Sequence, residues 1–328
     1  MLDPWLKQHL VCPRTRKPLE WHEEYLVSPA GHRYPIVDDV PIMLVEELPD
    51  TNPIRFETTR KQLADPLSMP PDPGLGKDEI DPYVRDQVVC TCGHMYDPIR
   101  DTMKRYPIPE IRLPPGEGKR LLDIGCGWGR WSVAAARKGY VPVGIDPSID
   151  RVRVARRIMK QLGLNGSFVV ADGRCMPFPD GVFEVVFSNG VLQHFSPESV
   201  RLTLAEVQRT LAPGGFSKIQ MATLWGPRNV MMAIKKKLFV KPGPFLVRYW
   251  PQGKLRRTFT ELIGPTTISV DGFFSINPQA SDLDLLPWKY RCVVHSSDFF
   301  RSLSDRAGWV GRFADSVYLQ SEPEKKAT

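Results

Sequence analysis

The chain has 328 residues, 42% hydrophobic and 25% charged, which is the balance of a globular protein with room for about two domains. It contains no apolar run of bilayer-spanning length, and its start lacks the features of a signal peptide. We therefore expect neither a transmembrane helix nor secretion. Six cysteines are too few for a disulfide scaffold in a chain this long, and the expected location is cytoplasmic.

The formal net charge of +7 is concentrated in one segment. Residues 226–260 hold nine basic residues and no Asp or Glu, so the rest of the chain is nearly neutral. A local excess of positive charge indicates a local partner. Because cations are mixed with aromatic and aliphatic residues here, anionic lipid, sugar phosphate or nucleic acid would suit the segment. A solvated charged face without a partner is the alternative.

The composition changes along the chain. Residues 1–48 are short apolar runs broken by turn residues, which predicts a small β-rich module. Residues 49–82 are rich in Pro and Asp, as in an exposed linker without its own core. In residues 83–328 strands alternate with helices, except that residues 225–295 break the pattern. We expect this last segment to be an inserted cap over the substrate site.

The alternation is clearest between residues 120 and 224. The predicted strands are 121–125, 140–146, 167–172, 181–189 and 216–223, and the predicted helices are 130–139, 148–163 and 197–215. A helix at 296–308 and a strand at 314–321 follow the cap. Strand–helix alternation implies right-handed crossovers and a parallel sheet, with ligands bound at the carboxyl ends of its strands.

A glycine-rich turn joins the first of these strands to its helix. Gly125, Gly127 and Gly129 have the spacing GxGxG, and Asp123 lies two residues before them. Glycines let a backbone approach a ligand closely. The dinucleotide fingerprint GxGxxG would need glycine at position 130, which is Arg130 here. The turn therefore favours another ligand, and a tight turn without any ligand is the alternative.

Acidic residues end the next two strands. Asp146 lies about 20 residues beyond Gly125, a spacing that suits hydrogen bonds to ribose hydroxyls. Asp172 could accept a hydrogen bond from an adenine amino group, with Met176 and Phe178 packing on the ring. One Asp at a strand end is more often a helix cap. Three at consecutive strand ends are harder to explain as caps, and they predict a nucleoside site at one edge of the sheet.

Taken together, these motifs resemble the class I S-adenosylmethionine-dependent methyltransferases of the type 11 group. LLDIGCGWG, VGIDPS, VVADGRCMPF and FEVVFSNGVLQH resemble their first four motifs, and LAPGGF resembles the turn before their fifth strand. The resemblance covers about residues 83–224 and the last strand. It implies a Rossmann-like α/β sheet of seven strands, the last antiparallel, with S-adenosylmethionine as cofactor and S-adenosylhomocysteine as product.

The site residues are also inferred with the help of this resemblance. The expected cofactor-binding residues are Asp123, Gly125, Cys126, Gly127, Asp146, Pro147, Asp172, Gly173, Arg174, Asn189 and Tyr96. The expected substrate-side residues are Trp128, Arg130, Gln193 and Tyr106. His194 follows the fourth strand, where the methyl group should point, and is the candidate base for a hydroxyl acceptor. A structural histidine behind the cofactor is the alternative.

The N-terminal residues carry a second resemblance. LVCPRTRKPL and HRYPIVDDVPIML are similar to the small Trm112-like modules of zinc-ribbon type. In that family the first cysteine has a partner nearby, whereas Cys12 has none. Cys90, Cys92 and His94 could join Cys12 and His32 as ligands, but CxC is not the usual zinc spacing. We expect no metal, and a β module packed on the catalytic domain.

The sequence thus predicts a methyltransferase acting on a small-molecule, glycan or lipid-linked acceptor, at a hydroxyl oxygen. The alternatives are an RNA or protein methyltransferase and a cofactor-binding scaffold without catalysis. Nucleic acid is not the expected partner, because no added RNA-binding module is present. Residues 228–257 predict peripheral contact with an anionic membrane surface. The oligomeric state is not predicted.

Overall fold

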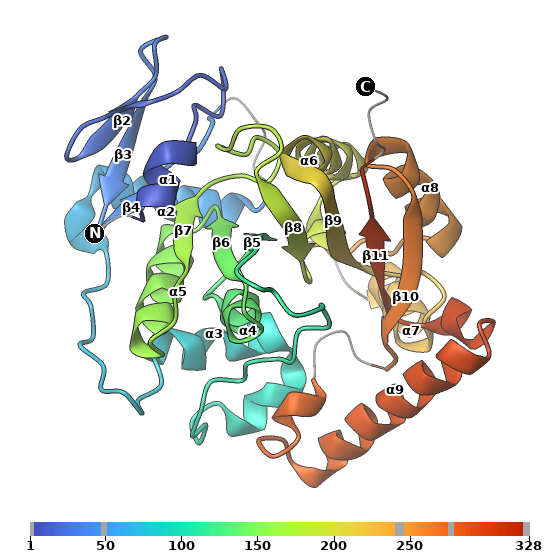
Figure 1. Cartoon of the computed structure of the whole chain (residues 1–328). Helices are drawn as coiled ribbons and strands as arrows, with labels where there is room; N and C mark the ends of the chain where they lie inside the picture. Colours follow the sequence, from blue (N-terminus) through green and yellow to red (C-terminus); the bar gives the residue numbers. More distant parts are fainter. Residues whose placement is uncertain (1–2, 47–50, 240–245, 275–278, 324–328) are drawn as a thin grey trace.

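The computed structural model describes residues 3–46, 51–239, 246–274 and 279–323, with backbone alone at residue 233 and over 235–239. It contains two β-sheets (Figure 1). The smaller sheet is antiparallel and consists of β1 (Glu20–Trp21), β2 (Tyr25–Val27), β3 (Arg33–Val37) and β4 (Val40–Pro41). This is the β-rich module expected at the N-terminus. Its resemblance to Trm112-like modules stays a prediction.

The larger sheet has seven strands in the order β10-β11-β9-β8-β5-β6-β7. These are β5 (Arg120–Ile124), β6 (Val141–Asp146), β7 (Ser167–Val170), β8 (Phe183–Ser188), β9 (Leu211–Ala222), β10 (Thr266–Gly272) and β11 (Ser316–Ser321). Strands β5 to β9 pair in parallel, whereas β11 runs antiparallel to both its neighbours. The expected Rossmann-like sheet with an antiparallel last strand is therefore confirmed.

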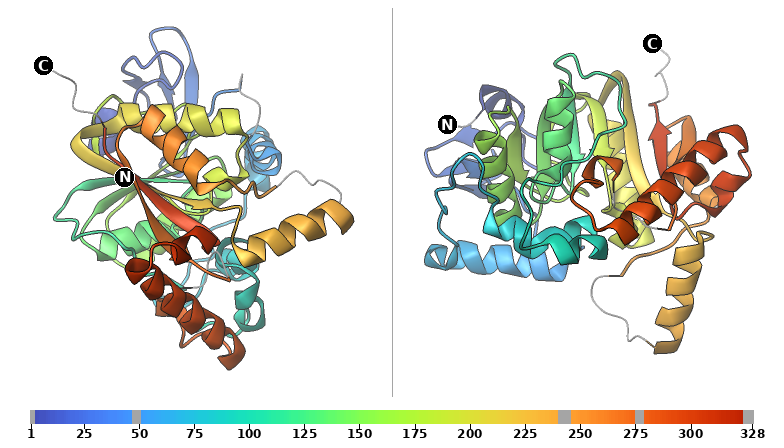
Figure 2. Two further views of the ribbon diagram at one scale, coloured as in Figure 1. Left: turned by 90° about the vertical axis from the view of Figure 1, so that its right-hand side faces the viewer. Right: turned by 90° about the horizontal axis from the view of Figure 1, so that it is seen from below.

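Helices cover both faces of this sheet, because its central strands are apolar on both sides. Leu121 of β5 packs with the helices of one face, and its neighbour Leu122 packs with those of the other. The first face carries α3 (Pro82–Cys92), α4 (Arg130–Arg137) and α5 (Ile149–Gln161); the second carries α1 (Pro4–His9), α6 (Pro197–Thr210) and α8 (Gln252–Leu262). Helix α9 (Trp288–Arg306) packs along β10, and α7 (Pro227–Phe239) projects from the body (Figure 2).

Short 3-10 helices occupy several connections. They are η1 (Pro66–Ser68), η2 (His94–Ile99), η3 (Leu192–His194), η4 (Ala280–Asp282) and η5 (Val310–Phe313). Helix α6 ends at Thr210 rather than at residue 215, because the Pro-Gly-Gly sequence already belongs to the irregular start of β9. In the described part of the chain, no helix is both long and apolar enough to cross a membrane.

The N-terminal module covers a gap on the second face of the larger sheet. Residues 171–182 join β7 to β8 without a helix. Leu6 and Leu26 of the module pack in the same apolar cluster as Phe178 of this connection. The Met43 amide donates to the Val170 carbonyl at 2.7 Å, in a short parallel continuation of the larger sheet beyond β7. The module is therefore fixed to the larger sheet by both apolar and backbone contacts.

The segment 49–82, expected as an exposed linker, contains a packed helix. Helix α2 (Pro53–Ala64) begins after Asn52, whose side chain accepts a hydrogen bond from the Arg55 amide. Phe56 and Thr59 on this helix are buried. An Asn cap followed by Pro is a helix-start signal. The high Pro and Asp content of the whole segment obscured that signal.

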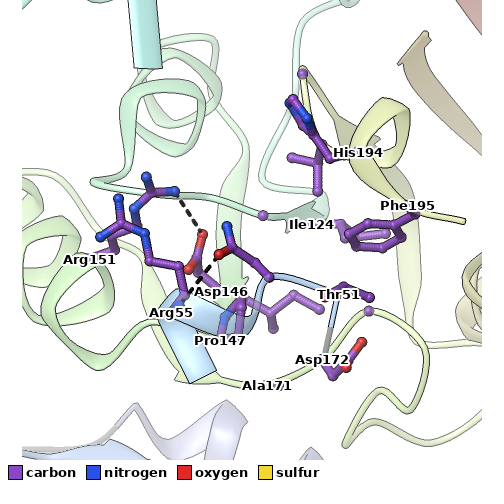
Figure 3. Close-up of a pocket in the computed structure, with 16 residues that line it drawn as sticks. Thr51, Arg55, Ile124, Asp146, Pro147, Arg151, Ala171, Asp172, His194 and Phe195 are labelled. Atoms are coloured by element: carbon purple, nitrogen blue, oxygen red, sulfur yellow. Dashed lines mark hydrogen bonds and ion pairs between the residues drawn. The ribbon is translucent and has the colours of Figure 1, made fainter. Parts of the chain in front are cut away.

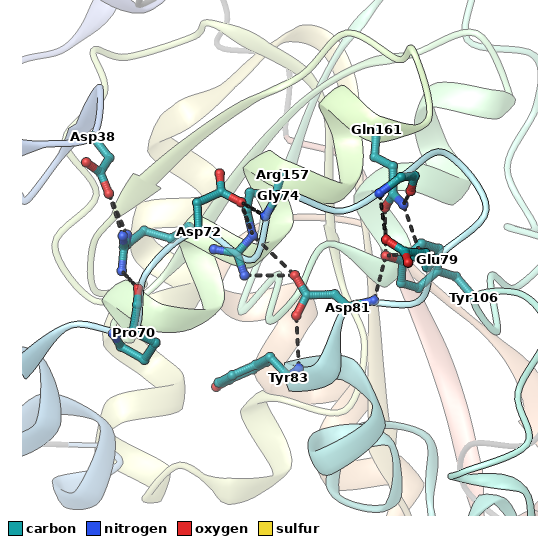
Figure 4. Close-up of polar contacts among 12 residues, drawn as sticks. Asp38, Pro70, Asp72, Gly74, Glu79, Asp81, Tyr83, Tyr106, Arg157 and Gln161 are labelled. Carbon is teal, nitrogen blue, oxygen red and sulfur yellow. Dashed lines mark hydrogen bonds and ion pairs between the residues drawn. The ribbon is translucent and has the colours of Figure 1, made fainter.

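The remainder of this segment is bound to α5 (Figure 4). The side-chain amide of Gln161 donates to the carbonyls of Gly76 and Glu79, at 2.6 and 2.8 Å. Arg157 forms an ion pair of 2.7 Å with Asp81, which caps α3. The segment therefore follows the surface of α5 instead of leaving it.

Residues 225–295, expected as one inserted cap, have two different places in the fold. Strand β10 lies at the edge of the larger sheet, and α8 packs on α6 and β11. In contrast, residues 246–250 approach the carboxyl ends of the parallel strands, where the Arg248 amide donates to the Gln193 carbonyl at 2.8 Å. Only part of the segment is therefore placed to act as a cap.

Candidate active site

Two adjoining cavities, of about 90 and about 240 Å³, lie at the carboxyl ends of β5, β6, β7 and β8 (Figure 3 shows the first). They share part of their lining, which comprises Asn52, Arg55, Gly125, Arg151, Gly190, Val191 and His194. The first cavity continues to Asp146, Pro147, Asp172 and Gly173, and the second continues to Cys126, Gly127, Trp128, Arg130, Asn189 and Gln193. Most of the residues expected from the sequence therefore meet in one place.

The turn after β5 gives the cavities a floor of backbone. Gly125 has a φ of +72°, and a Cβ atom on it would lie 2.4 Å from Cγ2 of Val191. Gly127 has a φ of +55°, and its amide donates to Oδ2 of Asp146 at 3.1 Å. Side chains rarely adopt such angles. The backbone angles of this turn therefore favour glycine at both positions.

Asp146 ends β6 on the wall of the first cavity. Its carboxylate is 4% exposed and accepts hydrogen bonds from the amides of Gly127 and Ser148, at 3.1 and 3.0 Å. Arg151 of α5 approaches it to 3.8 Å, and both side chains are seen on the same wall in Figure 3. The Nε atom of Arg151 is buried without a hydrogen-bond partner among the described residues. The pair therefore presents a carboxylate that is oriented by two backbone amides and a guanidinium that can donate a further hydrogen bond.

Asp172 follows β7 on another part of the wall. Its two oxygens accept hydrogen bonds from the guanidinium of Arg174, at 3.1 Å from Nε and 2.5 Å from Nη2. The Arg174 amide adds a bond of 2.9 Å. Asp172 and Gly173 line the cavity, whereas Arg174 does not. Arg174, expected to contact the cofactor, instead holds the carboxylate of Asp172.

Asp123 lies behind the cavities rather than on their surface. The Ser132 hydroxyl of α4 donates to its carboxyl group at 2.7 Å. Complete burial, together with the nearby carboxylate of Asp146, raises the pKa of Asp123 to about 7. Its expected contact with a cofactor is therefore replaced by a bond that fixes β5 to α4.

The two tyrosines expected near the site are also outside the lining of both cavities. The Tyr96 hydroxyl donates to Asp282 of η4 at 2.5 Å, and burial raises the pKa of this tyrosine. Tyr106 donates to Gln161 of α5 at 2.7 Å. Both side chains fasten the segment before β5 to neighbouring elements.

Four further expected residues line the second cavity with their side chains. Trp128 donates from its indole nitrogen to Thr91 at 3.0 Å, and Arg130 forms a buried ion pair of 2.8 Å with Asp282. Asn189 is bonded to the Tyr318 hydroxyl, on the antiparallel last strand, at 2.8 Å. The Oε1 atom of Gln193 is buried and has no hydrogen-bond partner in the described ranges. The first three side chains are therefore hydrogen-bonded or ion-paired within the protein, whereas Oε1 of Gln193 can accept a hydrogen bond from a ligand.

His194, at the end of η3, lines both cavities. Its Nδ1 atom lies 3.3 Å from the carbonyl oxygen of Leu246. A carbonyl can only accept, so Nδ1 carries the hydrogen when this bond forms and Nε2 keeps its lone pair. The geometry therefore sets the tautomer that a base acting through Nε2 requires.

With this geometry in place, comparison with known proteins is informative. Residues 121–215 match the family described as Methyltransferase domain. Over these residues the chain is similar to that family. It is 37% identical over 122 residues to a fatty-acid O-methyltransferase of Mycolicibacterium smegmatis, covering 35% of this chain and 43% of that protein. It is 30% identical over 139 residues to a ubiquinone biosynthesis O-methyltransferase of Rhizobium etli, covering 42% and 52%.

Solved structures show similar proteins at lower identity. The YcgJ protein of Bacillus subtilis is 20% identical, with a TM-score of 0.44 and coverage of 64% of this chain and 94% of that one. A Haemonchus contortus phosphoethanolamine N-methyltransferase 2 is 17% identical, with a TM-score of 0.46 and coverage of 75% and 61%. The chain spans about half the length of the curated relatives quoted above.

Sequence reasoning missed several residues that line the two cavities. Among them are Asn52, which caps α2, Arg55 of α2, Thr91 of α3, Arg151 of α5 and Val191 after β8. The Asn-Pro start of α2 was a usable signal for the first two. Arg151 lies in the first turn of the helix after Asp146, so its proximity to that carboxylate could have been predicted. Nothing in the sequence singled out Thr91 or Val191.

The candidate metal ligands were Cys12, His32, Cys90, Cys92 and His94. The described residues contain no group of three or more His, Cys, Asp or Glu side chains placed to hold a metal ion. Cys12 is buried with its sulfur 3.1 Å from the Tyr34 hydroxyl, and His32 contacts Arg14. Cys92 is buried on α3, within the apolar cluster of the first face. Cys12, His32 and Cys92 therefore have protein partners of their own.

Proposed function

We propose that the protein is an S-adenosylmethionine-dependent methyltransferase. One observation carries the proposal: two adjoining cavities bring together the glycine turn after β5 and the carboxylates that end β6 and β7. Such an arrangement can bind ribose hydroxyls, an adenine ring and a methionine tail at once. The similarity of residues 121–215 to the family described as Methyltransferase domain supports the same reading.

The residues present suit this cofactor. Asp146 would hold the ribose hydroxyls, and Asp172 with Gly173 would face the adenine. Arg151, whose Nε has no described partner, is complementary in charge to the carboxylate of the methionine part. Glycine at position 125 allows the close approach of Val191, which also lines both cavities. When bound, S-adenosylmethionine supplies an electrophilic methyl group on a sulfonium.

The acceptor side of the pocket supports transfer to oxygen. A hydroxyl acceptor must lose its proton, and His194 lines both cavities in the tautomer that leaves Nε2 able to take it. Both relatives quoted above are named O-methyltransferases. Trp128 and Trp131 give the second cavity aromatic walls, while Gln193 Oε1 offers one acceptor. This mixture suits a small or lipid-linked acceptor that is apolar and carries a hydrogen-bond donor.

The test is methyl transfer itself. The protein is incubated with methyl-labelled S-adenosylmethionine and a panel containing a hydroxylated fatty acid, a prenylated phenol, a sugar, an RNA and a peptide. We expect labelled product from one of the first three, with S-adenosylhomocysteine formed in equal amount. Label in RNA or peptide alone would contradict the acceptor class. Cofactor binding without any transfer would favour a scaffold.

His194→Ala tests the role of the base. We expect turnover to fall by roughly 100-fold or more, since general bases contribute about that much, while S-adenosylmethionine affinity stays unchanged. His295→Ala, at an exposed position on α9, is the matched control and should keep full activity. Full turnover by His194→Ala would exclude the histidine as the base.

A further inference from the structure

Helix α7 exposes apolar side chains that a surface helix normally turns inward. Met231 and Ile234 are three residues apart and so lie on one face, and they are 48% and 55% exposed. Trp225, just before the helix, is also exposed. At the start of the helix Asn229 is buried and anchored to the backbone of Thr223 and Asp315. The helix is therefore fixed at one end, and beyond that point it projects from the body (Figure 2).

The charge of α7 itself indicates what this apolar stripe would meet. Arg228, Lys235, Lys236 and Lys237 fall within α7, which contains no acidic residue. A projecting helix that combines an apolar stripe with lysines has the composition of a helix lying in a membrane interface. The charge is complementary to anionic lipid headgroups, and the stripe matches the acyl region below them.

The chain that follows α7 returns to the active site. The Leu246 carbonyl accepts from His194, and the Arg248 amide donates to the Gln193 carbonyl at 2.8 Å. The Arg248 side chain also donates to the His194 carbonyl, at 2.5 Å. Residues 246–248 therefore lie beside the candidate base, and α7 precedes them in the chain.

We propose that α7 docks in the interface of an anionic membrane and brings the cavity beside His194 to a lipid-linked acceptor. The docking rests on the exposed stripe and the basic residues of α7. Only the choice of acceptor rests on the proposed methyl transfer. A lipid-linked substrate then reaches the cavity from the membrane surface, without its apolar part crossing water.

The experiment uses the full chain and vesicles of phosphatidylcholine, with or without about one third phosphatidylglycerol. Bound protein is measured by co-sedimentation at low salt, and again at about ten times that ionic strength, which screens surface charge. Ile234→Glu places a charge on the stripe. Leu202→Glu places the same charge at an exposed leucine of α6 and is the matched control. Thermal unfolding checks that both variants are folded.

We expect binding to the anionic vesicles at low salt, weakened by salt and reduced roughly tenfold by Ile234→Glu, since the glutamate opposes insertion of the stripe. Leu202→Glu should bind like the wild type. Equal binding to neutral vesicles, no binding at low salt, or wild-type binding by Ile234→Glu would overturn the proposal. It would also be overturned if Ile234→Glu instead dissociated a dimer, or if single-stranded RNA displaced the vesicles. Titration of Ile234→Glu with S-adenosylmethionine separates failure of membrane docking from failure of the proposed function. A variant that binds S-adenosylmethionine but not the vesicles has lost docking alone.

Discussion

Asp123 illustrates how one residue type serves two roles at the same sheet edge. Asp146 and Asp172 line the pocket, whereas Asp123 is turned into the interior and bonded to Ser132. Burial of a carboxylate without a charged partner disfavours its ionised form, and this is why the pKa of Asp123 is raised to about 7. Sequence position alone could not separate these roles, because all three residues stand near the carboxyl end of a strand.

The raised pKa of Asp123 predicts a specific dependence of stability on pH. Between the normal Asp value of about 4 and the raised value, the folded protein holds a proton that the unfolded chain has lost. The contribution of this group to stability therefore falls as pH rises through that range. Asp123→Asn keeps an acceptor for Ser132 and does not titrate. We expect its free energy of unfolding, relative to wild type, to increase by a few kcal/mol from about pH 4 to about pH 7.

Urea titrations at several pH values measure this difference. Asp180→Asn, at an exposed position, is a control for general effects of removing a carboxylate. A difference between Asp123→Asn and wild type that does not change with pH would show that Asp123 does not titrate in this range.

At the scale of elements, the sequence predicted the parallel part of the sheet well. Strands β5 to β8 and helices α4 and α5 lie within two residues of their expected bounds, because apolar runs ending at Asp or Gly are strong local signals. The positions of α2 and of the segment bound to α5 could not be predicted from such local signals. Their place depends on contacts between residues about 80 apart in sequence, such as Gln62 with Asp150.

Helix α2 positions the loop after β6 through one hydroxyl group. Thr59 donates to the Pro147 carbonyl at 2.8 Å and accepts from the Ile149 amide at 3.1 Å, in place of a cap from Ser148. Thr59→Val keeps the shape and leaves the Ile149 amide unpaired, at a cost of about 1–3 kcal/mol. We expect lower stability and several-fold weaker binding of S-adenosylmethionine, because Asp146 and Pro147 are less well fixed.

The two controls for Thr59→Val are close in structure. Thr59→Ser keeps the hydroxyl and should restore binding, while Thr58→Val changes a hydroxyl on the solvent side of the same helix. Calorimetric titration measures the dissociation constants. If Thr59→Val lost stability but bound the cofactor as tightly as Thr59→Ser, α2 would support the fold without positioning the site.

For the whole molecule, the N-terminal module and the larger sheet share one apolar cluster. Leu6 of α1 packs there with residues of β5, β6 and β7, and the connection from β7 to β8 supplies no helix of its own to that face. The sequence predicted a β-rich module packed on the catalytic domain. It did not indicate which face of the sheet the module would cover, because that depends on how the two parts pack.

Leu6→Ala tests whether the two parts unfold together. Truncating a buried leucine costs about 2–5 kcal/mol, and we expect the whole chain to lose that amount in one cooperative transition. Leu202→Ala, at a leucine that is 42% exposed, should change stability by less than about 0.5 kcal/mol. Fluorescence and circular dichroism during urea unfolding would report this. Two separate transitions, with only the first affected by Leu6→Ala, would show that the module unfolds independently.

The most direct test of the proposed function is calorimetric titration of the purified protein with S-adenosylmethionine, S-adenosylhomocysteine and NAD. The pocket predicts binding of the first two with release or uptake of heat, no binding of NAD, and loss of binding in Asp146→Ala, because the ribose hydroxyls lose their acceptor. Asp305→Ala, at an exposed position on α9 and outside the lining of both cavities, is the control. Binding of NAD alone, or of neither methyl donor nor product, would contradict the assignment of this pocket.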